Sequence, residues 1–196
     1  MNIFMEVNNY CELKCRFCVA DLGYKYANTN ISMELIDEIL CKYKDEPKKA
    51  IFFTGGEPLL HPAILQIVNK FAIDGYYTYM TTNGQHLKDE KFAIDFLFSG
   101  IHRISIPIYG SCAVIYDKMT GVDGSFDALK RGLDNIFYIK NKYAPHVKIE
   151  LRLLMAKFNI ANNTDVVDWI VDNYPEVDYI SILGLQLSSR TNNYEH

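Results

Sequence analysis

The chain has 196 residues, of which 49% are hydrophobic and 22% charged, and its 20 basic and 24 acidic residues give a net charge of −4. This composition is typical of one globular domain with a substantial core, and no long run of one charge indicates a nucleic-acid partner. No apolar run reaches the roughly 20 residues of a membrane span, and the first residues lack the basic start of a signal peptide, so we expect a cytoplasmic protein without membrane association.

Short apolar segments alternate along the chain with segments of helical periodicity. Strands are predicted at residues 2–7, 49–54, 76–82, 103–108, 147–154 and 177–183. Helices are predicted after a cap at residues 30–32 and at residues 64–71, 88–97, 125–142 and 164–174, with a connection at residues 109–124. Pro107 is expected at a strand end or on an edge strand, because proline cannot donate a hydrogen bond to a ladder.

This alternation predicts parallel strands joined by right-handed crossovers. Six strands are fewer than the eight of a closed (β/α)8 barrel, so we predict an α/β fold, a partial (β/α)6 barrel of parallel strands. The barrel would form one domain over residues 1–187, followed by a polar tail at residues 188–196. The loops after the strands would gather at the carboxyl edge of the sheet, where such folds place their active sites. That edge would bring together residues 9–18, 55–58, 83–84, 108–110 and 184–185.

Three of the five cysteines, Cys11, Cys15 and Cys18, lie in the loop after the first predicted strand. In a reducing cytoplasm, clustered cysteines are better interpreted as metal ligands or catalytic groups than as disulfides. Thiolates at this spacing can converge on one centre, and thiolate is the ligand that iron–sulfur clusters and zinc favour. A structural zinc site needs a fourth protein ligand, and no Cys or His follows at a suitable spacing. Three ligands leave one coordination position open.

A second stretch, Gly55-Gly56-Glu57-Pro58, follows the next predicted strand. Its two glycines let the backbone approach a ligand closely, and Glu57 or neighbouring carbonyls can accept hydrogen bonds from an ammonium group. Gly and Pro also mark ordinary strand-to-helix turns, so this stretch alone leaves both interpretations open.

Together with Phe17, directly before the third cysteine, these two stretches resemble the radical SAM superfamily, and the resemblance covers essentially the whole chain. It implies a [4Fe–4S] cluster held by Cys11, Cys15 and Cys18, whose fourth iron is chelated by the amino and carboxylate groups of S-adenosylmethionine (SAM). An electron donor such as a flavodoxin or ferredoxin would reduce the cluster. Cleavage of SAM would then give a 5′-deoxyadenosyl radical that abstracts hydrogen from a substrate.

The resemblance also implies roles for single residues at the strand ends. Phe17 would pack near the adenine, the alternative being a core aromatic. Arg152 needs an anionic partner, which is either the cofactor or one of Glu150 and Glu6. Asn83 and Ser105 would contact the cofactor or merely satisfy the backbone. The implied SAM-binding residues are Gly55, Gly56, Glu57, Pro58, Phe17, Asn83, Ser105 and Arg152.

The other two cysteines, Cys41 and Cys112, cannot bind a second cluster on a four-thiolate plan. Cys41 falls opposite the apolar stripe of its predicted helix, so we expect it near the surface. Cys112 follows the fourth predicted strand, where it is either a catalytic hydrogen donor that borders the site or a structural thiol.

The substrate is less constrained by the sequence. The region from Ser105 to Phe126, with Tyr109-Gly110, Tyr116-Asp117 and Thr120-Gly121, resembles radical SAM maturases that modify peptides or proteins. A short open barrel would also leave a gap that a bulky partner could fill. Both features favour a peptide or protein substrate. The alternatives are a small metabolite or nucleotide, the activation of a glycyl-radical enzyme, and a non-catalytic protein that binds an iron–sulfur cluster or SAM.

Overall fold

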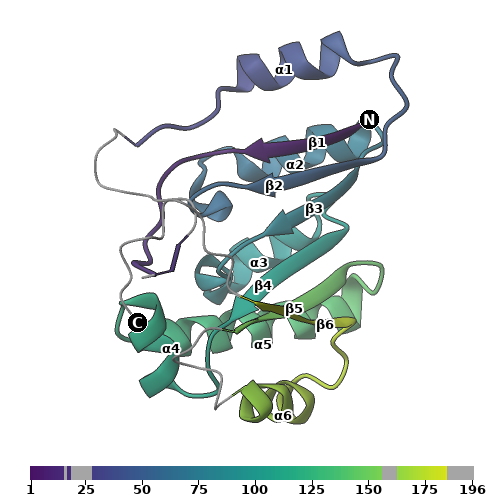
Figure 1. Cartoon of the computed structure of the whole chain (residues 1–196). Helices are drawn as coiled ribbons and strands as arrows, with labels where there is room; N and C mark the ends of the chain where they lie inside the picture. Colours follow the sequence, from purple (N-terminus) through teal and green to yellow (C-terminus); the bar gives the residue numbers. More distant parts are fainter. Residues whose placement is uncertain (16, 19–27, 156–162, 185–196) are drawn as a thin grey trace.

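The computed structural model describes residues 1–15, 17–18, 28–155 and 163–184. Its strands are β1 (Asn2–Glu6), β2 (Ala50–Thr54), β3 (Tyr77–Thr81), β4 (Arg103–Ile108), β5 (Lys148–Met155) and β6 (Tyr179–Gly184). They form one parallel sheet in the order β1-β2-β3-β4-β5-β6, with β1 and β6 as its edges (Figure 1). The predicted α/β fold, an open partial barrel of six parallel strands, is confirmed. The predicted tail at residues 188–196 and position 185 lie outside the described residues.

Helices connect the strands and cover one face of the sheet. They are α1 (Met33–Lys42), α2 (Ile64–Ile73), α3 (Glu90–Leu97), α4 (Ala113–Thr120), α5 (Ser125–Tyr143) and α6 (Asn163–Asn173), with two short 3-10 helices, η1 (Pro58–Leu60) and η2 (Gln85–Lys88). In Figure 1, α2, α3 and α5 lie behind the sheet, whereas α1 lies toward the β1 edge and α6 toward the β6 edge. No helix in the described part of the chain has both the length and the apolar character to cross a membrane.

Helix α4 lies in the segment that the sequence predicts as a connection. Tyr116, Met119 and Thr120 are its buried residues, and Val114 is 82% exposed. Such a short helix with few inward residues shows little helical periodicity, which is why the pattern did not predict it. It ends at Gly121, whose φ of +68° is the left-handed conformation common at helix ends.

Side-chain caps determine where two helices begin. Ser32 Oγ accepts a hydrogen bond from Leu35 N–H at 3.2 Å, so the predicted cap of α1 is confirmed. Asp89 Oδ1 accepts one from Phe92 N–H at 2.8 Å. Helix α3 therefore begins at Glu90 rather than at residue 88 as predicted.

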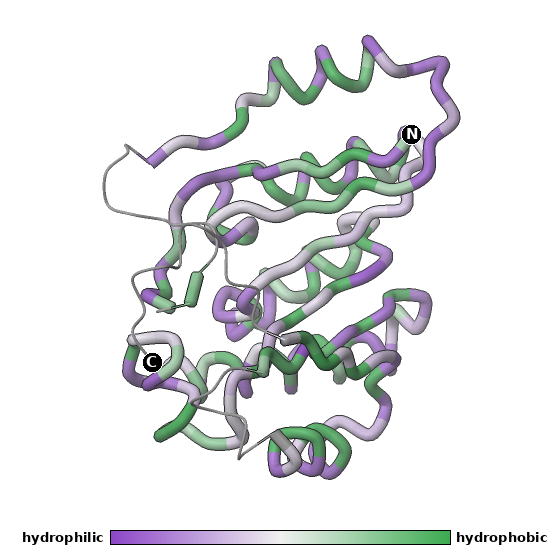
Figure 2. The backbone as a smooth tube through the Cα atoms, in the orientation of Figure 1, coloured by the Kyte–Doolittle hydropathy of each residue, from purple (hydrophilic) through white to green (hydrophobic). Residues whose placement is uncertain are grey.

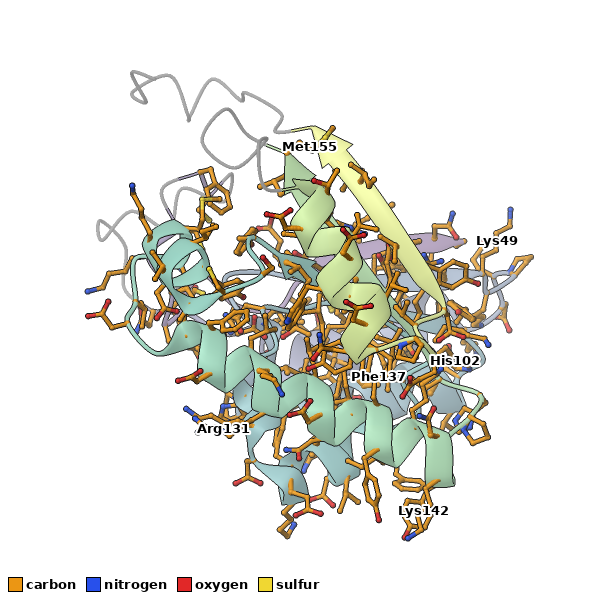
Figure 3. The ribbon with its side chains drawn as sticks, turned by 90° about the horizontal axis from the view of Figure 1, so that it is seen from below. Lys49, His102, Arg131, Phe137, Lys142 and Met155 are labelled. Atoms are coloured by element: carbon orange, nitrogen blue, oxygen red, sulfur yellow. The ribbon has the colours of Figure 1, made fainter. Side chains whose placement is uncertain are left out.

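The core lies between the helices and the sheet. Alternate strand residues are buried there, and Phe53 of β2 packs edge-on against Phe71 of α2 with ring centroids 5.7 Å apart. On α5, Phe137 points toward the sheet while Arg131 and Lys142 point away from it (Figure 3). Figure 2 shows that hydrophobic and hydrophilic residues also alternate along the helices.

Pro107 lies on an interior strand, because β4 pairs with both β3 and β5. The expectation of an edge strand is therefore wrong. The last β4 residue in register with β3 is Ser105, opposite Thr81, so Pro107 lies beyond the end of that ladder. Its position agrees with the other expectation, a strand end.

The opposite face of the sheet is the inner face of the partial barrel. Register places Phe4, Phe52, Tyr79 and Arg103 side by side across four strands. Phe4 and Phe52 stack with centroids 4.6 Å apart, and the Arg103 guanidinium lies 5.3 Å from the ring centroid of Tyr79 and 4.2 Å from that of Tyr179. Phe4 is 77% exposed, so this face presents accessible aromatic surface.

The carboxyl ends of the strands all point to one edge of the sheet, as parallel pairing requires. The loop after β1, η1 and α4 gather at this edge (Figure 1). Met155, at the end of β5, lies far from His102 and Lys49, which precede β4 and β2 (Figure 3). The sheet therefore brings together the loops that carry the predicted site.

Candidate cofactor site at the carboxyl edge of the sheet

The cysteine loop, residues 9–18, follows β1 and is described except at position 16. Two apolar side chains anchor it, because Leu13 and Phe17 are both buried. The Phe17 ring packs edge-on against Tyr109 with centroids 4.9 Å apart, so Phe17 belongs to the core. The three thiols of this loop, at Cys11, Cys15 and Cys18, are free and only partly buried.

The cysteine loop lies directly against Gly55 and Gly56. Gly56 N–H donates to Asn8 O at 3.0 Å, and Glu57 N–H donates to Tyr10 O at 2.8 Å. A Cβ atom on Gly56 would lie 2.0 Å from Tyr10 O, and one on Gly55, whose φ is +151°, would lie 2.6 Å from Asn8 O. These two glycines are therefore required by the close approach of two backbones, whatever ligand the stretch also binds.

Glu57 joins the loop after β2 to the loop after β3. Its side chain is buried, with the residue 1% exposed. The carboxylate accepts hydrogen bonds from Leu59 N–H at 2.9 Å, Thr82 Oγ1 at 2.5 Å and Asn83 N–H at 2.7 Å. A carboxylate has about four acceptor positions, so about one is left for the ammonium group of a ligand. In the described structure Glu57 mainly fixes one loop against the other.

The burial of Glu57 should make stability depend on pH. Burial raises the pKa of this carboxyl from 4.5 to about 7, although hydrogen bonds from Asn83 and Thr82 act in the opposite direction. Between these values the folded chain holds a proton that the unfolded chain has lost. The free energy of unfolding should therefore fall as the pH rises from 4.5 to about 7, by an amount on the order of 3 kcal/mol.

Urea unfolding at several pH values measures this slope. Glu57→Gln, which cannot titrate, should flatten it, and Glu46→Gln, at an exposed position, should leave it unchanged. The assignment is wrong if wild type and Glu57→Gln lose stability equally over that window.

Asn83 connects Glu57 to the first cysteine. The residue is 8% exposed, and its Oδ1 accepts a hydrogen bond from Gln85 N–H at 2.9 Å. Its Nδ2 donates to Cys11 Sγ at 3.5 Å and to Glu12 Oε1 at 3.2 Å. Cys11 Sγ also accepts from Leu13 N–H at 3.4 Å. Asn83, which the resemblance implies as a SAM contact, thus lies at the site and contacts the cysteine loop.

The turn between α4 and α5 supports the other side of the cysteine loop. At the end of α4, Thr120 O accepts a hydrogen bond from Lys14 N–H at 2.8 Å. The Asp117 carboxylate shapes the turn by accepting hydrogen bonds from Gly124 N–H at 2.7 Å, Ser125 Oγ at 2.8 Å and Phe126 N–H at 2.8 Å. These contacts give a structural role to several of the residues that resemble peptide-modifying maturases.

Asp117→Ala should lower the free energy of unfolding by about 2 kcal/mol, because the variant leaves the donors of the turn without their acceptor. Urea denaturation measures the loss. Asp123→Ala, at an exposed position in the same turn, is the matched control and should change stability by no more than about 0.5 kcal/mol. Equal stabilities of the two variants would contradict the role given to Asp117.

Ser105 of β4 and Arg152 of β5 lie on the inner face. Arg152 Nη2 donates to Tyr79 Oη at 2.6 Å and lies 3.4 Å from Glu150 Oε2, so Glu150 is one of its partners. Ser105 Oγ and Arg152 Nε are buried and have no hydrogen-bond partner among the described residues. A buried donor without an acceptor is unfavourable, so an added acceptor group such as a carboxylate fits this place.

Glu150 is the carboxylate that the two arginines of the inner face contact. It is 3% exposed, and its Oε2 accepts from Tyr79 Oη at 2.9 Å and Arg103 Nη2 at 3.0 Å, while Ser181 Oγ donates to Oε1. Burial raises its pKa, but hydrogen bonds from Ser181 and Tyr79 and the two guanidinium groups outweigh burial and hold the pKa below its ordinary value. Arg103 and Arg152 thus share one ionised carboxylate, and one positive charge is left for an anionic group.

The two cysteines outside the loop are both exposed. Cys41 lies on α1, so its expected position near the surface is confirmed. Cys112 is the residue before α4, and its side chain makes no capping hydrogen bond. It is therefore not a thiol of the core.

The three thiols of the cysteine loop fit a metal centre by their chemistry. Burial raises the pKa of Cys11, with a further contribution from Glu12, and burial together with Cys18 raises the pKa of Cys15 to about 12. Such thiols stay protonated until a cation replaces the proton. In the described part of the chain no three His, Cys, Asp or Glu side chains are grouped closely enough to hold a single metal ion. A [4Fe–4S] cluster does not need such a grouping, because each cysteine binds a different iron.

Several residues that hold the site together were not found from the sequence. They are Asn8 and Tyr10, which meet the glycines, and Thr82, which reaches Glu57. The signal for Thr82 was its position between a strand and Asn83-Gly84, because a polar side chain that is buried at a strand end needs a hydrogen-bond partner. Asn8 and Tyr10 act through backbone oxygens and also through side chains, since Asn8 Nδ2 donates to Glu57 O at 2.7 Å and Tyr10 Oη donates to Leu60 O at 3.1 Å. These contacts join segments far apart in the sequence, so residue type alone does not predict them.

Comparison with known proteins supports this interpretation. A family model described as the radical SAM superfamily matches residues 5–139. The chain is 26% identical to the probable GTP 3′,8-cyclase of Thermococcus kodakarensis over 86% of this chain and 52% of the relative. It is 25% identical to the AdoMet-dependent heme synthase of Oleidesulfovibrio alaskensis over 67% of this chain and 34% of the relative. Streptococcus suis SuiB bound to S-adenosylmethionine has a similar fold, with a TM-score of 0.75 and 18% identity over 96% of this chain and 41% of SuiB.

The matched residues begin in β1 and end within α5. They include the cysteine loop, the stretch Gly55-Gly56-Glu57-Pro58, Asn83 and the Asp117 turn. The chain spans between about a third and about half of the length of the two curated relatives. With its three-cysteine loop and its parallel partial barrel, the chain belongs to the radical SAM superfamily.

Proposed function

We propose that this chain is the core of a radical SAM enzyme that cleaves SAM reductively at a [4Fe–4S] cluster and abstracts hydrogen from a substrate. The observation that carries the proposal is the loop of three free cysteines at the carboxyl edge of the sheet, in a chain of this superfamily. When bound together and reduced, the cluster and SAM supply a 5′-deoxyadenosyl radical. The protein itself has to hold, orient and shield these groups.

Cys11, Cys15 and Cys18 would hold three of the four irons of the cluster, leaving the fourth for SAM. The stretch Gly55-Gly56-Glu57-Pro58 would bind the SAM amino group, chiefly through backbone carbonyls, because most acceptor positions of Glu57 are already used. The partly buried thiols leave the edge open to an electron donor such as a flavodoxin or ferredoxin. Reduced thiols also agree with a cytoplasmic location.

The SAM carboxylate or ribose would bind beside Ser105 and Arg152. Both side chains have a buried polar atom without a partner among the described residues, at Ser105 Oγ and Arg152 Nε. The unbalanced positive charge of Arg103 and Arg152 around Glu150 favours an anionic group at the same place.

A peptide or protein is the substrate we propose first. The sheet is open between β1 and β6, and its inner face exposes Phe4 at 77% and Tyr179 at 44%, which gives a large apolar group room to bind. The similar fold of SuiB, which has also been solved with its precursor peptide SuiA, supports this choice.

A nucleotide is the second candidate substrate. It is favoured by the curated relatives named as GTP 3′,8-cyclases, one of which is 31% identical over 66% of this chain. Aromatic side chains and an arginine on the inner face suit a planar base with phosphates as well as a peptide.

Release of 5′-deoxyadenosine tests the proposed function. The full chain, reconstituted anaerobically with iron and sulfide and then reduced, should convert SAM to methionine and 5′-deoxyadenosine. A protein that binds both cluster and SAM but forms no 5′-deoxyadenosine would be a non-catalytic binder.

The substrate is tested by the same assay in the presence of GTP or of candidate peptides encoded beside the gene. The true substrate should accelerate 5′-deoxyadenosine formation, and a deuterated substrate should transfer deuterium to it. Transfer from GTP but from no peptide would favour the second candidate.

A further inference from the structure

A buried side-chain amide is directed at one of the cysteine sulfurs. Asn83 Oδ1 accepts from Gln85 N–H at 2.9 Å, which fixes the orientation of the amide and turns Nδ2 toward the cysteine loop. Nδ2 donates to Cys11 Sγ at 3.5 Å and to Glu12 Oε1 at 3.2 Å. Glu57 holds the backbone of the same residue by accepting its N–H at 2.7 Å. The donor is therefore fixed in place before any centre binds.

We propose that Asn83 is a positioning residue that raises the reduction potential of the cluster through its hydrogen bond to Cys11. The inference rests on the proposed function, since it needs the cluster. A hydrogen bond to a ligating sulfur stabilises the reduced cluster, which carries more negative charge, more than the oxidised one. The effect is strengthened by burial, because Asn83 is 8% exposed and a low local dielectric increases electrostatic interactions. Asn83 thus makes the cluster easier for a donor to reduce.

Glu12 has the opposite influence. Its Oε2 lies 3.7 Å from Cys11 Sγ, and its side chain is exposed. A carboxylate beside the cluster disfavours an added electron, so Glu12 lowers the potential. Asn83 and Glu12 are both neighbours of Cys11, and they also contact each other. Removing the Asn83 amide should lower the reduction potential, and removing the Glu12 carboxylate should raise it.

The test is a redox titration of the reconstituted full chain without SAM, followed by electron paramagnetic resonance of the reduced cluster. Asn83→Ala should shift the midpoint potential to a more negative value. Asn83→Asp should shift it further, because it adds a negative charge while it keeps the acceptor for Gln85 N–H. Glu12→Gln should shift it to a less negative value. Asn135→Ala is the control, since its Nδ2 bonds only Leu87 O and Lys88 O among the contacts described, and it should leave the potential unchanged.

The iron and sulfide content of each variant has to be measured as well, because it shows whether a change in potential comes from an intact cluster. Asn83→Ala and Asn83→Asp with full clusters and the wild-type potential would overturn the inference and leave the proposed function intact. If Asn83→Ala does not fold, Asn83→Asp alone decides, because it preserves the internal hydrogen bond of the loop. A wild-type chain that forms no cluster would overturn the proposed function and the inference with it.

Discussion

Gly56→Ala should lower the free energy of unfolding by about 3–5 kcal/mol. The added Cβ would lie 2.0 Å from Tyr10 O and 2.3 Å from Tyr10 C, which are backbone atoms that cannot rotate away. Moving them would also break the hydrogen bonds from Glu57 N–H to Tyr10 O and from Gly56 N–H to Asn8 O. Urea denaturation of the unloaded chain measures the loss, and iron content after reconstitution shows whether the displaced cysteine loop still binds a cluster.

Gly184→Ala is the matched control for this substitution. Gly184 also ends a strand, but a Cβ there meets none of the described residues within 4 Å, so stability should change by no more than about 0.5 kcal/mol. If Gly56→Ala were as stable as Gly184→Ala, the cysteine loop and the end of β2 could not be in contact as described.

Replacement of Cys11, Cys15 or Cys18 by Ala should abolish the visible absorbance of the reconstituted cluster and with it all formation of 5′-deoxyadenosine. Each variant leaves two thiolates, which cannot hold the three irons that the protein has to bind. Because these side chains are only partly buried, the fold itself should persist, which circular dichroism can verify.

Cys41→Ala and Cys112→Ala provide the controls, since both cysteines are exposed and lie outside the loop. Cys41→Ala should keep the wild-type iron content and activity. Cys112→Ala should keep the cluster, and a selective loss of substrate turnover with normal SAM cleavage would identify Cys112 as a hydrogen donor. A Cys15→Ala protein with a full cluster would refute the ligand assignment.

Much of the architecture could be predicted because it depends on patterns of residue type. The alternation of apolar runs and helical periodicity predicted all six described strands and their parallel pairing. The residues of the carboxyl edge followed from that topology, since the loops after parallel strands meet on one side. The prediction failed where a short helix has little apolar periodicity, as in α4, and of the two positions predicted for Pro107 the edge strand was wrong.

The internal connections of the site could not be predicted in the same way. Glu57 or neighbouring carbonyls were predicted to accept hydrogen bonds from a ligand. The residue pattern could not show that the Glu57 carboxylate also accepts from Thr82 and Asn83, the donors that its burial requires. The role of Asp117 depends on hydrogen bonds to residues seven to nine positions further along the chain, whose geometry no periodicity reveals. Contacts between backbones, such as that of Gly56 with Tyr10, are encoded only by the absence of a side chain.

The hydrogen bond from Lys14 N–H to Thr120 O links the beginning of the chain to the end of α4. During translation at about 5–20 residues per second, the cysteines precede Thr120 by roughly 5–20 s. During these seconds the nascent cysteine loop lacks the turn that supports one of its sides. Until Gly56 has been synthesised, the loop also lacks its contact with the end of β2. The cysteine loop can therefore take the shape described here only after Thr120 has been synthesised.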